Sequence, residues 1–399
     1  IVEKSRQPLS KRSMQASFAE WQRPKSSAFI IRYLLIIITP VFSRSENDCI
    51  TIHILLYHTK KSKHFKYTNR LKNINVYYII KSKISLKRVT AVRKYDITAL
   101  GEILIDFVPD GVDSVGDMRF IRKAGGAPLN VLATAARAGL KTAFIGKVGN
   151  DLPGEFLIET VKGCGIDCNY LKKDTEHNTT LAFVELDNKG DRKFSFYRTY
   201  GADRFIYESD VDKKLIADSK VFHFGSLSLT DEPSYFSTEI AVKTAKDCGC
   251  TVTYDPNYRP PLWDSPEKAA ERMAVLLPYV DIIKLSVEEL EMISEGRGTG
   301  FLFEKGVRIA LVTDGDKGAT LCFKGEKAHI PAIKAKTVDT TGAGDIFLGT
   351  FVSEFIKKGE NLDELSFDDA INFTQKAVFI SGKSTEKYGA ISSISDVII

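Results

Sequence analysis

Glycine is missing from the first hundred positions of this 399-residue chain, since all 28 glycines lie from Gly101 onward. Proteins of ordinary composition contain about 7% glycine, which they use in turns and at helix ends. The glycine-free stretch shows no helical or strand period and no repeat, so its pattern does not predict a folded domain. Its longest apolar run, residues 28–42, is interrupted by Arg32 and Pro40. A membrane span needs about 20 apolar residues, so this run is too short.

Cysteine and histidine are also scarce, with six of each. Cys49 lies in the glycine-free stretch, and the other five cysteines show neither C-x-x-C spacing nor a nearby histidine, which argues against a zinc site and a disulfide scaffold. We therefore expect reduced thiols and a cytoplasmic protein. The histidines beyond the glycine-free stretch are expected on the surface or in the core rather than in catalysis: His177, His223 and His329.

The excess of positive charge is confined to the N-terminal stretch. Residues 1–91 hold 18 Lys and Arg against 4 Asp and Glu, a charge of +14, so the other 38 basic and 47 acidic residues carry −9. The net charge of +5 and the pI near 8.6 are therefore no evidence about the partners of the rest of the chain. We expect neither a nucleic-acid partner nor a membrane partner.

Three interpretations of residues 1–91 stay open. The favoured one is translated DNA upstream of the true start, because Lys, Ile, Asn and Tyr have AT-rich codons and glycine has GC-rich ones. Val92 is then a plausible start. A disordered basic tail and a targeting peptide are the alternatives, although residues 43–45 (Ser-Arg-Ser) give no small-x-small cleavage site.

From residue 95 onward, apolar runs of strand length alternate with amphipathic stretches of helix length. This alternation predicts one α/β domain over residues 92–399, a doubly wound, mostly parallel sheet flanked by helices. We predict strands at residues 96–107, 142–148, 221–224, 251–254, 282–285 and 309–313, and helices at 128–138, 152–164, 235–248, 267–279, 287–294, 343–357 and 367–381.

Two segments, near residues 108–124 and 179–200, break the alternation. The second is expected to be a hairpin around the turn residues Asn188, Lys189 and Gly190. We expect the two segments to form a small β-sheet lid, which would exclude water from a reacting phosphate.

The most informative motif is Val-Asp-Thr-Thr-Gly-Ala-Gly-Asp at residues 338–345, which opens an apolar helix. Glycines at a helix N-terminus let backbone N–H groups approach an anion, and the helix dipole favours negative charge there. Asp345 would repel a phosphate that is only bound, but it suits a general base that takes a proton from an attacking hydroxyl. The alternative is a glycine-rich turn in which Asp345 caps the helix.

A second glycine cluster, Ala-Gly-Gly-Ala-Pro-Leu-Asn at residues 124–130, precedes a helix of small residues. Gly125 and Gly126 would let a ligand approach the backbone, and Asn130 can both donate to and accept from a sugar hydroxyl. The alternative is an ordinary helix start with Pro128 in its first turn.

Together the two motifs resemble the signatures of the ribokinase-like (PfkB) carbohydrate kinases, in the same order and at a similar separation. The resemblance covers residues 95–399 and none of 1–91. Within the family, residues 101–107, 123–130, 254–263 and 389–394 are most similar to bacterial and plant fructokinases. The 2-keto-3-deoxygluconate kinases share several of these features, including residues 196–198, and are the alternative.

By this resemblance, Asp345 is the general base, and Gly342, Ala343 and Gly344 supply N–H groups that stabilise the transferring phosphoryl. The resemblance also implies a sugar pocket that contains Asp106, Gly125, Gly126, Asn130, Arg198 and Arg259. Asp106 is expected at the end of the first strand, where α/β sheets bind ligands.

The nucleotide side is implied to include Asn257, Ser286, Glu289, Thr313, Gly315, Gly318, Gln375 and Gly389, with Asp255 beside them. Ser286 stands where the family commonly has Asn, whereas Glu289 keeps the acidic position that helps to place Mg²⁺ through water. Asp339, Thr341 and Ser393 match the monovalent-cation site of some relatives. The expected cofactors are therefore ATP and Mg²⁺, with K⁺ as a further candidate.

The function that follows is an ATP-dependent fructokinase, which by resemblance phosphorylates the hydroxyl on carbon 6 of fructose. A kinase for 2-keto-3-deoxygluconate or another small sugar is the alternative among enzymes, and an acidic substrate should prefer a pocket richer in arginine. A non-catalytic sugar-binding regulator is the alternative of another class, which the complete Gly-Ala-Gly-Asp motif disfavours. Because family relatives dimerise through the lid, a homodimer is also implied.

Overall fold

The computed structural model describes residues 34–37, 53–56, 93–186 and 192–394. The chain divides into two units, Ile1–Leu86 and Lys87–Ile399. In the first unit, β1 (Leu34–Ile37) and β2 (His53–Leu56) form an antiparallel pair, which the sequence pattern did not predict. The three interpretations of residues 1–91 otherwise fall outside the described residues, as do Val92 and the predicted turn at residues 188–190.

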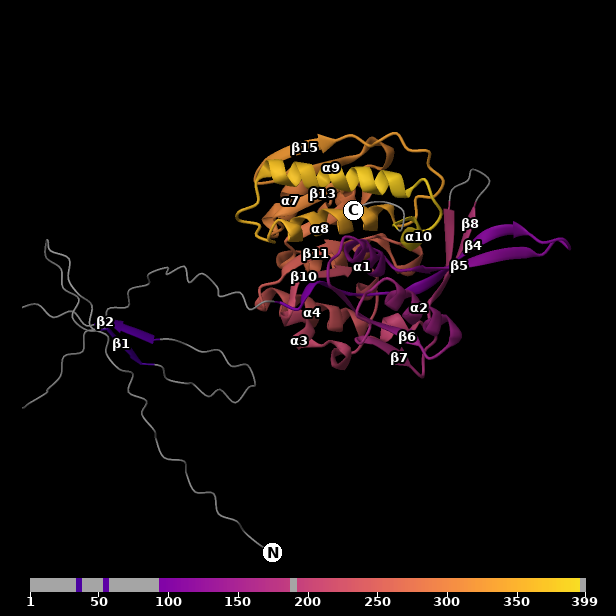
Figure 1. Ribbon diagram of the computed structural model, residues 1–399, viewed down its shortest axis with the longest axis horizontal. Coiled ribbons are helices and arrows are strands. Elements are labelled where there is room, and N and C mark those ends of the chain that lie inside the picture. Colours follow the sequence, from indigo (N-terminus) through magenta and orange to yellow (C-terminus); the bar gives the residue numbers. More distant parts are fainter. Residues whose placement is uncertain (1–33, 38–52, 57–92, 187–191, 395–399) are drawn as a thin grey trace, which may run out of the picture. The chain divides into compact units, whose positions relative to one another are not determined.

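The second unit is built on a nine-stranded sheet (Figure 1). Its strands in spatial order are β15 (Glu326–Ile330), β14 (Ala319–Phe323), β13 (Ile309–Thr313), β12 (Ile282–Ser286), β11 (Thr251–Asp255), β10 (Ser219–Gly225), β3 (Tyr95–Leu100), β6 (Thr142–Gly149) and β7 (Leu171–Asp174). Pairing is parallel from β13 to β7 and antiparallel only at β14 and β15. The prediction of a doubly wound, mostly parallel sheet is therefore confirmed.

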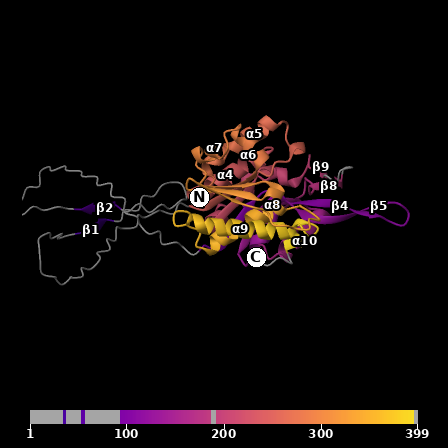
Figure 2. The same ribbon diagram turned by 90° about the horizontal axis from the view of Figure 1, so that it is seen from above.

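Two helical layers cover the sheet, one on each face (Figure 2). One hydrophobic core lies against α1 (Ala127–Arg137), α2 (Leu152–Gly163), α8 (Ala343–Lys357) and α9 (Phe367–Ser384). The other lies against α3 (Lys213–Ala217), α4 (Ser234–Asp247), α5 (Pro266–Val275), α6 (Val287–Ser294) and α7 (Thr299–Glu304). The central strands contribute side chains to both cores, which is why their sequences read as continuous apolar runs.

Several helices begin where the sequence supplies a capping side chain. Asp151, Ser265 and Ser366 each accept a hydrogen bond from a backbone N–H of the helix that follows, and a proline occupies the first turn of α2 and of α5. These caps satisfy N–H groups that have no partner within the helix. Local chemistry thus fixes the helix starts that the sequence pattern predicts.

A separate four-stranded sheet forms the lid (Figures 1 and 2). Its order is β5 (Met118–Gly125), β4 (Leu104–Val112), β8 (Leu181–Leu186) and β9 (Arg192–Tyr197). The predicted strand over residues 96–107 is wrong in one respect, because the chain breaks after Gly101 and enters the lid as β4. A Cβ on Gly101 would lie 2.7 Å from Cγ of Pro128, so the chain passes tightly under the start of α1 at this point.

The strand order reverses next to β3. The chain runs from β3 to β6 and β7 on one side, then returns to place β10 on the other side of β3. In open α/β sheets such a reversal leaves a crevice at the carboxyl ends of the strands, where ligands bind. The lid begins directly after β3, so it adjoins this crevice.

Candidate active site

Asp345 lies in the first turn of α8. The helix begins at Gly342, which has φ 74° and no capping side chain. A Cβ on Gly342 would lie 2.3 Å from Cβ of Ala390, the first residue of α10 (Ala390–Ile394), so only glycine fits this turn. The N–H of Ala343 donates to the carbonyl of Thr340 at 3.2 Å, so the turn leaves the N–H groups of Gly344 and Asp345 available for an anion.

The Asp345 carboxylate is buried and receives two side-chain amides. Nδ2 of Asn130 donates to Oδ2 at 2.8 Å, and Nδ2 of Asn257 lies 3.5 Å from Oδ1. Burial, together with the negative charge of Asp255, raises the pKa of Asp345 to about 7. The interpretation of Asp345 as a helix cap is not supported, because its hydrogen bonds join other elements. A buried carboxyl with a pKa near neutrality suits acid–base chemistry.

Lys284 brings a positive charge to the same place. Its Nζ, on β12, donates to Oδ2 of Asp255 at 3.0 Å, and both side chains are buried. Burial alone would lower the pKa of Lys284, but the charges of Asp255, Glu289 and Asp345 outweigh it and raise that pKa above its usual value. The site therefore holds a charged ammonium beside its carboxylates.

Asp106 lies in the lid strand β4, not at the end of the first strand of the large sheet as predicted. It is paired in register with Lys123 of β5 and Ala182 of β8. A Cβ on Gly125 would lie 2.3 Å from Oδ2 of Asp106, so the carboxylate rests against a glycine backbone. Gly126 has φ 114°, and a Cβ there would lie 2.5 Å from the carbonyl oxygen of Glu102. Glycine is thus required at both positions, because neighbouring atoms approach the backbone too closely for a side chain.

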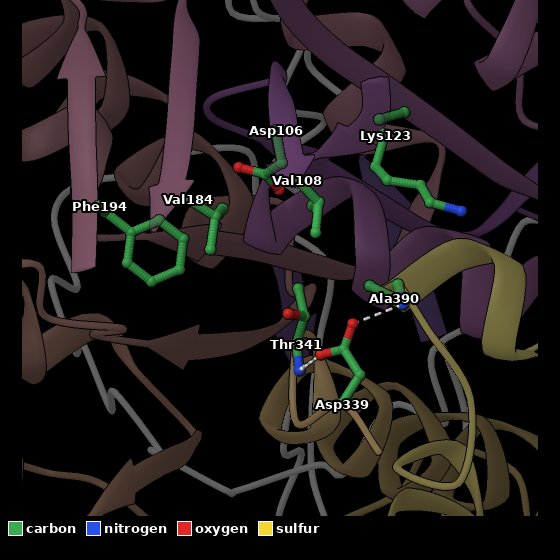
Figure 3. A pocket seen from close by; sticks show the side chains of 10 residues that line it. Asp106, Val108, Lys123, Val184, Phe194, Asp339, Thr341 and Ala390 are labelled. Atoms are coloured by element: carbon green, nitrogen blue, oxygen red, sulfur yellow. Dashed lines mark hydrogen bonds between the residues drawn. The ribbon is translucent and has the colours of Figure 1, made fainter. Parts of the chain in front are cut away.

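A pocket opens between the lid and the segment that leads into α8 (Figure 3). The lid contributes Asp106, Val108, Lys123, Ala124, Val184 and Phe194, and the C-terminal part of the chain contributes Asp339, Thr341, Gly389 and Ala390. Phe194, Val184 and Val108 form one apolar wall, whereas Asp106 and Lys123 supply charge. A pocket with a few polar groups on apolar walls is typical of a small-molecule site.

Asp339 joins the two C-terminal segments of the pocket. Its Oδ1 accepts a hydrogen bond from the N–H of Thr341 at 2.7 Å, and its Oδ2 accepts one from the N–H of Gly389 at 2.8 Å (Figure 3). The hydroxyl of Ser393 donates to the carbonyl of Ala390 at 2.7 Å. The residues expected at a K⁺ site therefore lie within two contacting segments.

The two predicted arginines differ in their surroundings. Arg198 is buried, and its guanidinium donates to Asp203 at 2.7 Å, to Thr230 at 2.9 Å and to the carbonyl of Leu227 at 2.9 Å. These contacts give Arg198 a structural role in joining the end of β9 to the loop after β10. Arg259 is half-buried, and its positive charge lowers the pKa of Asp345 against the effect of burial.

Ser286 and Glu289 form a capping box at the start of α6. The N–H of Glu289 donates to Oγ of Ser286 at 3.1 Å, and the N–H of Ser286 donates to Oε2 of Glu289 at 2.7 Å. Oε1 of Glu289 accepts the N–H of Tyr258 at 2.6 Å. The pair thus holds the segment that carries Asn257 beside Asp345, a local role that the S-x-x-E spacing already indicates.

The remaining residues predicted for the nucleotide side lie along the sheet edge and on α9. Thr313 ends β13, and Gly315 lies in the turn after it with φ 51°. A Cβ on Gly318 would lie 2.1 Å from the carbonyl oxygen of Ile330, so packing leaves room for glycine and no larger residue at this position. Gln375 is exposed near the middle of α9, and no hydrogen bond joins it to another described residue of the site.

Three charged residues near the site were not assigned a role from the sequence: Lys284, Lys123 and Glu102. The methylenes of Lys123 lie 3.6 and 3.7 Å from the position of a Cβ on Gly389. Glu102 accepts the N–H of Ala127 at 2.9 Å and so fixes the start of α1, and burial raises the pKa of Glu102 to about 7. A charged residue within an otherwise apolar predicted strand was the available signal for both Lys284 and Glu102.

Residues 94–396 match the pfkB family of carbohydrate kinases, and the chain belongs to that family. "Probable fructokinase-5" of Arabidopsis thaliana is 42% identical over 275 residues, 67% of this chain and 85% of that protein. The structure of fructokinase with bound ATP from Xylella fastidiosa is similar with a TM-score of 0.70 and 28% identity, over 75% of this chain and 94% of that one. A double mutant of fructokinase from Vibrio cholerae, with fructose, ADP and a potassium ion bound, has a TM-score of 0.68 and 27% identity, over 76% of this chain and 96% of that one.

Proposed function

We propose that this carbohydrate kinase transfers the γ-phosphoryl group of ATP to the carbon-6 hydroxyl of fructose. The observation that carries the proposal is the hydrogen bond between Asn130 and Asp345, which joins the sugar-side motif to the candidate base at the N-terminus of α8. The relatives named fructokinase, and the solved fructokinases with ATP or with fructose and ADP, support the choice of both substrates.

In the proposed reaction, an oxygen of Asp345 takes the proton of the sugar hydroxyl as that hydroxyl oxygen forms its bond to the γ-phosphorus. The bond from the γ-phosphorus to the bridging oxygen breaks, and ADP leaves. The N–H groups of Gly342 and Gly344 would face the developing charge on the phosphoryl, which helix N-termini stabilise, whereas that of Ala343 donates to the carbonyl of Thr340. Asp106 and Asn130 orient the sugar, and the lid strands keep water from the reacting phosphoryl.

The residues present fit the metal ions of this reaction. Mg²⁺ takes most of its ligands from phosphates and water and needs only one or two carboxylates, which Glu289 can supply through water. The described residues contain no cluster of three His, Cys, Asp or Glu side chains that could hold a metal without a nucleotide, which suits an ion that arrives with ATP. Asp339, Thr341 and Ser393 are the residues that would hold K⁺. Bound Mg²⁺ would neutralise charge on the phosphates.

The surroundings of Arg198 favour a neutral sugar over the alternative, 2-keto-3-deoxygluconate. An acidic substrate needs a free cation, whereas the guanidinium of Arg198 is held by Asp203, Thr230 and Leu227. The test is a panel of sugars with Mg·ATP and the full chain, in which kcat/KM is measured for each. Fructose should give the highest value. A higher value with 2-keto-3-deoxygluconate would make that sugar the substrate, and the absence of turnover with every sugar tested would favour a non-catalytic regulator.

The lid also supports the proposed homodimer. Phe107 stacks on Phe183 with a centroid distance of 4.9 Å, and Phe120 and Tyr197 contact Phe183 edge-on at 5.5 Å. Because side chains alternate along a strand, Phe107 and Phe183 lie on the face opposite Val108 and Val184, away from the pocket. Phe120 and Tyr197 are exposed there. A second copy of this chain is the proposed occupant. No helix of the described residues is long and apolar enough to cross a membrane, and a cytoplasmic location is part of the proposal.

A further inference from the structure

The ammonium of Lys284 has more donors than the protein uses. Lys284 is the third of the four residues predicted for the apolar strand at 282–285, and its side chain is nine-tenths buried. Among the described residues, Nζ of Lys284 donates a hydrogen bond to one acceptor, Oδ2 of Asp255, at 3.0 Å. An ammonium carries three N–H donors, and leaving them unused in a buried place is unfavourable. The unused donors therefore indicate a missing acceptor.

The position of Nζ shows where that acceptor would lie. A Cβ on Gly344 would lie 2.6 Å from Nζ and 3.2 Å from Cε of Lys284. The ammonium thus occupies the space that a side chain at residue 344 would take, at the first turn of α8 and one residue before Asp345. The N–H groups of Gly344 and Asp345 belong to the same turn and have no backbone acceptor among the described residues, so both features favour an anion there.

We infer that Lys284 binds the transferring phosphoryl group of this active site, with its ammonium donating to a phosphoryl oxygen held at the N-terminus of α8. The inference rests on the proposed phosphoryl transfer and names a residue for it. Asp255 holds the ammonium in place, and Gly344 leaves the room for it. Because Nζ lies beside the turn that carries the base, the ammonium would hold the phosphoryl group as it passes to the sugar hydroxyl, so this contact would lower the barrier more than it tightens ATP binding.

Lys284 also sets the charge around the base. Asp345 is faced by Asp255 and Arg259 from the end of β11 and by Lys284 from β12, while Glu289 of α6 faces Lys284. Without Lys284, the hydrogen bond from Asn130 and the charge of Arg259 would still oppose burial and the charge of Asp255, but less strongly. The protonated form of Asp345 would then persist to higher pH, and the acidic limb of kcat/KM would move up with it.

The test compares Lys284→Met with Lys147→Met in the full chain. Lys147 is a matched control, because it is also a buried strand lysine paired with a carboxylate, Asp210 at 2.7 Å, outside the site. Lys284→Met should lower kcat by about 100-fold or more, change KM for ATP much less, and move the acidic limb up by about one pH unit. Lys147→Met should change thermal stability but neither kcat nor the acidic limb. If Lys284→Met acts like Lys147→Met, the pair with Asp255 is only structural and the inference fails.

A second variant covers the case in which Lys284→Met does not fold. Lys284→Arg keeps the charge, so the acidic limb should stay within about 0.3 pH units. Its guanidinium is larger than the space beside Gly344, so kcat should fall at least about tenfold. A wild-type kcat in Lys284→Arg would overturn the inference. These assays use the sugar that the wild type phosphorylates fastest. If fructose is not the substrate, the wild type alone shows this, before any variant is compared.

Discussion

Nδ2 of Asn130 donates a 2.8 Å hydrogen bond to Oδ2 of Asp345, between residues 215 positions apart in the chain. This bond joins the first turn of α1 to the first turn of α8. The two glycine motifs that open these helices therefore form a single site. The amide also fixes the carboxylate in one orientation, so that its other oxygen faces Asn257.

The first prediction is a pH dependence that reports the base. Because burial and the charge of Asp255 raise the pKa of Asp345 to about 7, the base is mostly protonated below that pH. The kcat/KM for the sugar should therefore rise about tenfold per pH unit below 7 and level off above it. Steady-state assays from pH 5.5 to 8.5, with Mg·ATP saturating, measure the profile. A profile that stays flat down to pH 5.5 would contradict the raised pKa of Asp345.

The second prediction concerns stability. The pKa of Asp345 is higher in the folded protein than in the unfolded chain, so the folded state binds more protons between about pH 4 and pH 7, and Asp345 lowers stability as pH rises through that window. Asp345→Asn removes the ionisation, so at pH 8 it should be more stable than the wild type by up to about 4 kcal/mol. The gain should vanish near pH 4. Thermal or urea unfolding at both values measures it, and a variant less stable at pH 8 would contradict the cause given for the pKa.

The third prediction concerns the sugar pocket. In Gly125→Ala the new Cβ would lie 2.3 Å from Oδ2 of Asp106, so the carboxylate must move. We expect KM for the sugar to rise at least about tenfold, since a displaced hydrogen-bonding group costs about 1.4 kcal/mol or more. Gly163→Ala is the control, because nothing lies within 4 Å of a Cβ there. An unchanged KM in Gly125→Ala would remove Asp106 from the pocket.

The fourth prediction tests assembly. Phe120→Asp places a charge on the outer face of the lid, where the native ring is 40% exposed and contacts Phe183. It should convert a dimer of the wild type into a monomer, as measured by light scattering after gel filtration. Phe236→Asp, at a site 53% exposed on α4, should leave the dimer intact. A monomeric wild type, or a dimeric Phe120→Asp, would contradict assembly through this face.

Much of the large sheet could be predicted from apolar runs, because strands that are buried on both faces are apolar at nearly every position. The predicted strand at residues 309–313 and helices at 287–294 and 343–357 match β13, α6 and α8. The antiparallel pair β14 and β15 was missed, since half of β15 is exposed and its residues Glu326 and Lys327 are polar. The break between β3 and β4 was missed because it depends on packing between Gly101 and Pro128, which are distant in sequence.

The site could be predicted in part. Glycines and acidic residues in the two motifs identify Asp345, Gly125 and Asn130, because their chemistry is local. The role of Arg198 could not be predicted, since its partners Asp203 and Thr230 come from other loops. Lys284 was missed for the same reason: one lysine within an apolar strand carries no sign of its partner until its distance to Asp255 is known.

The most direct test of the central claim is the phosphorylation of fructose by the full chain and by its Asp345→Asn variant. ADP formation with Mg·ATP and fructose is followed by a coupled assay, and the site of phosphorylation is determined by ³¹P and ¹³C NMR. The wild type should produce ADP only when fructose is present and should form fructose 6-phosphate. Asp345→Asn should be folded and slower in kcat by about 10²–10⁴-fold, the range that general base catalysis contributes. A near-normal kcat in the variant, or ADP formation by the wild type that does not depend on fructose, would contradict the account.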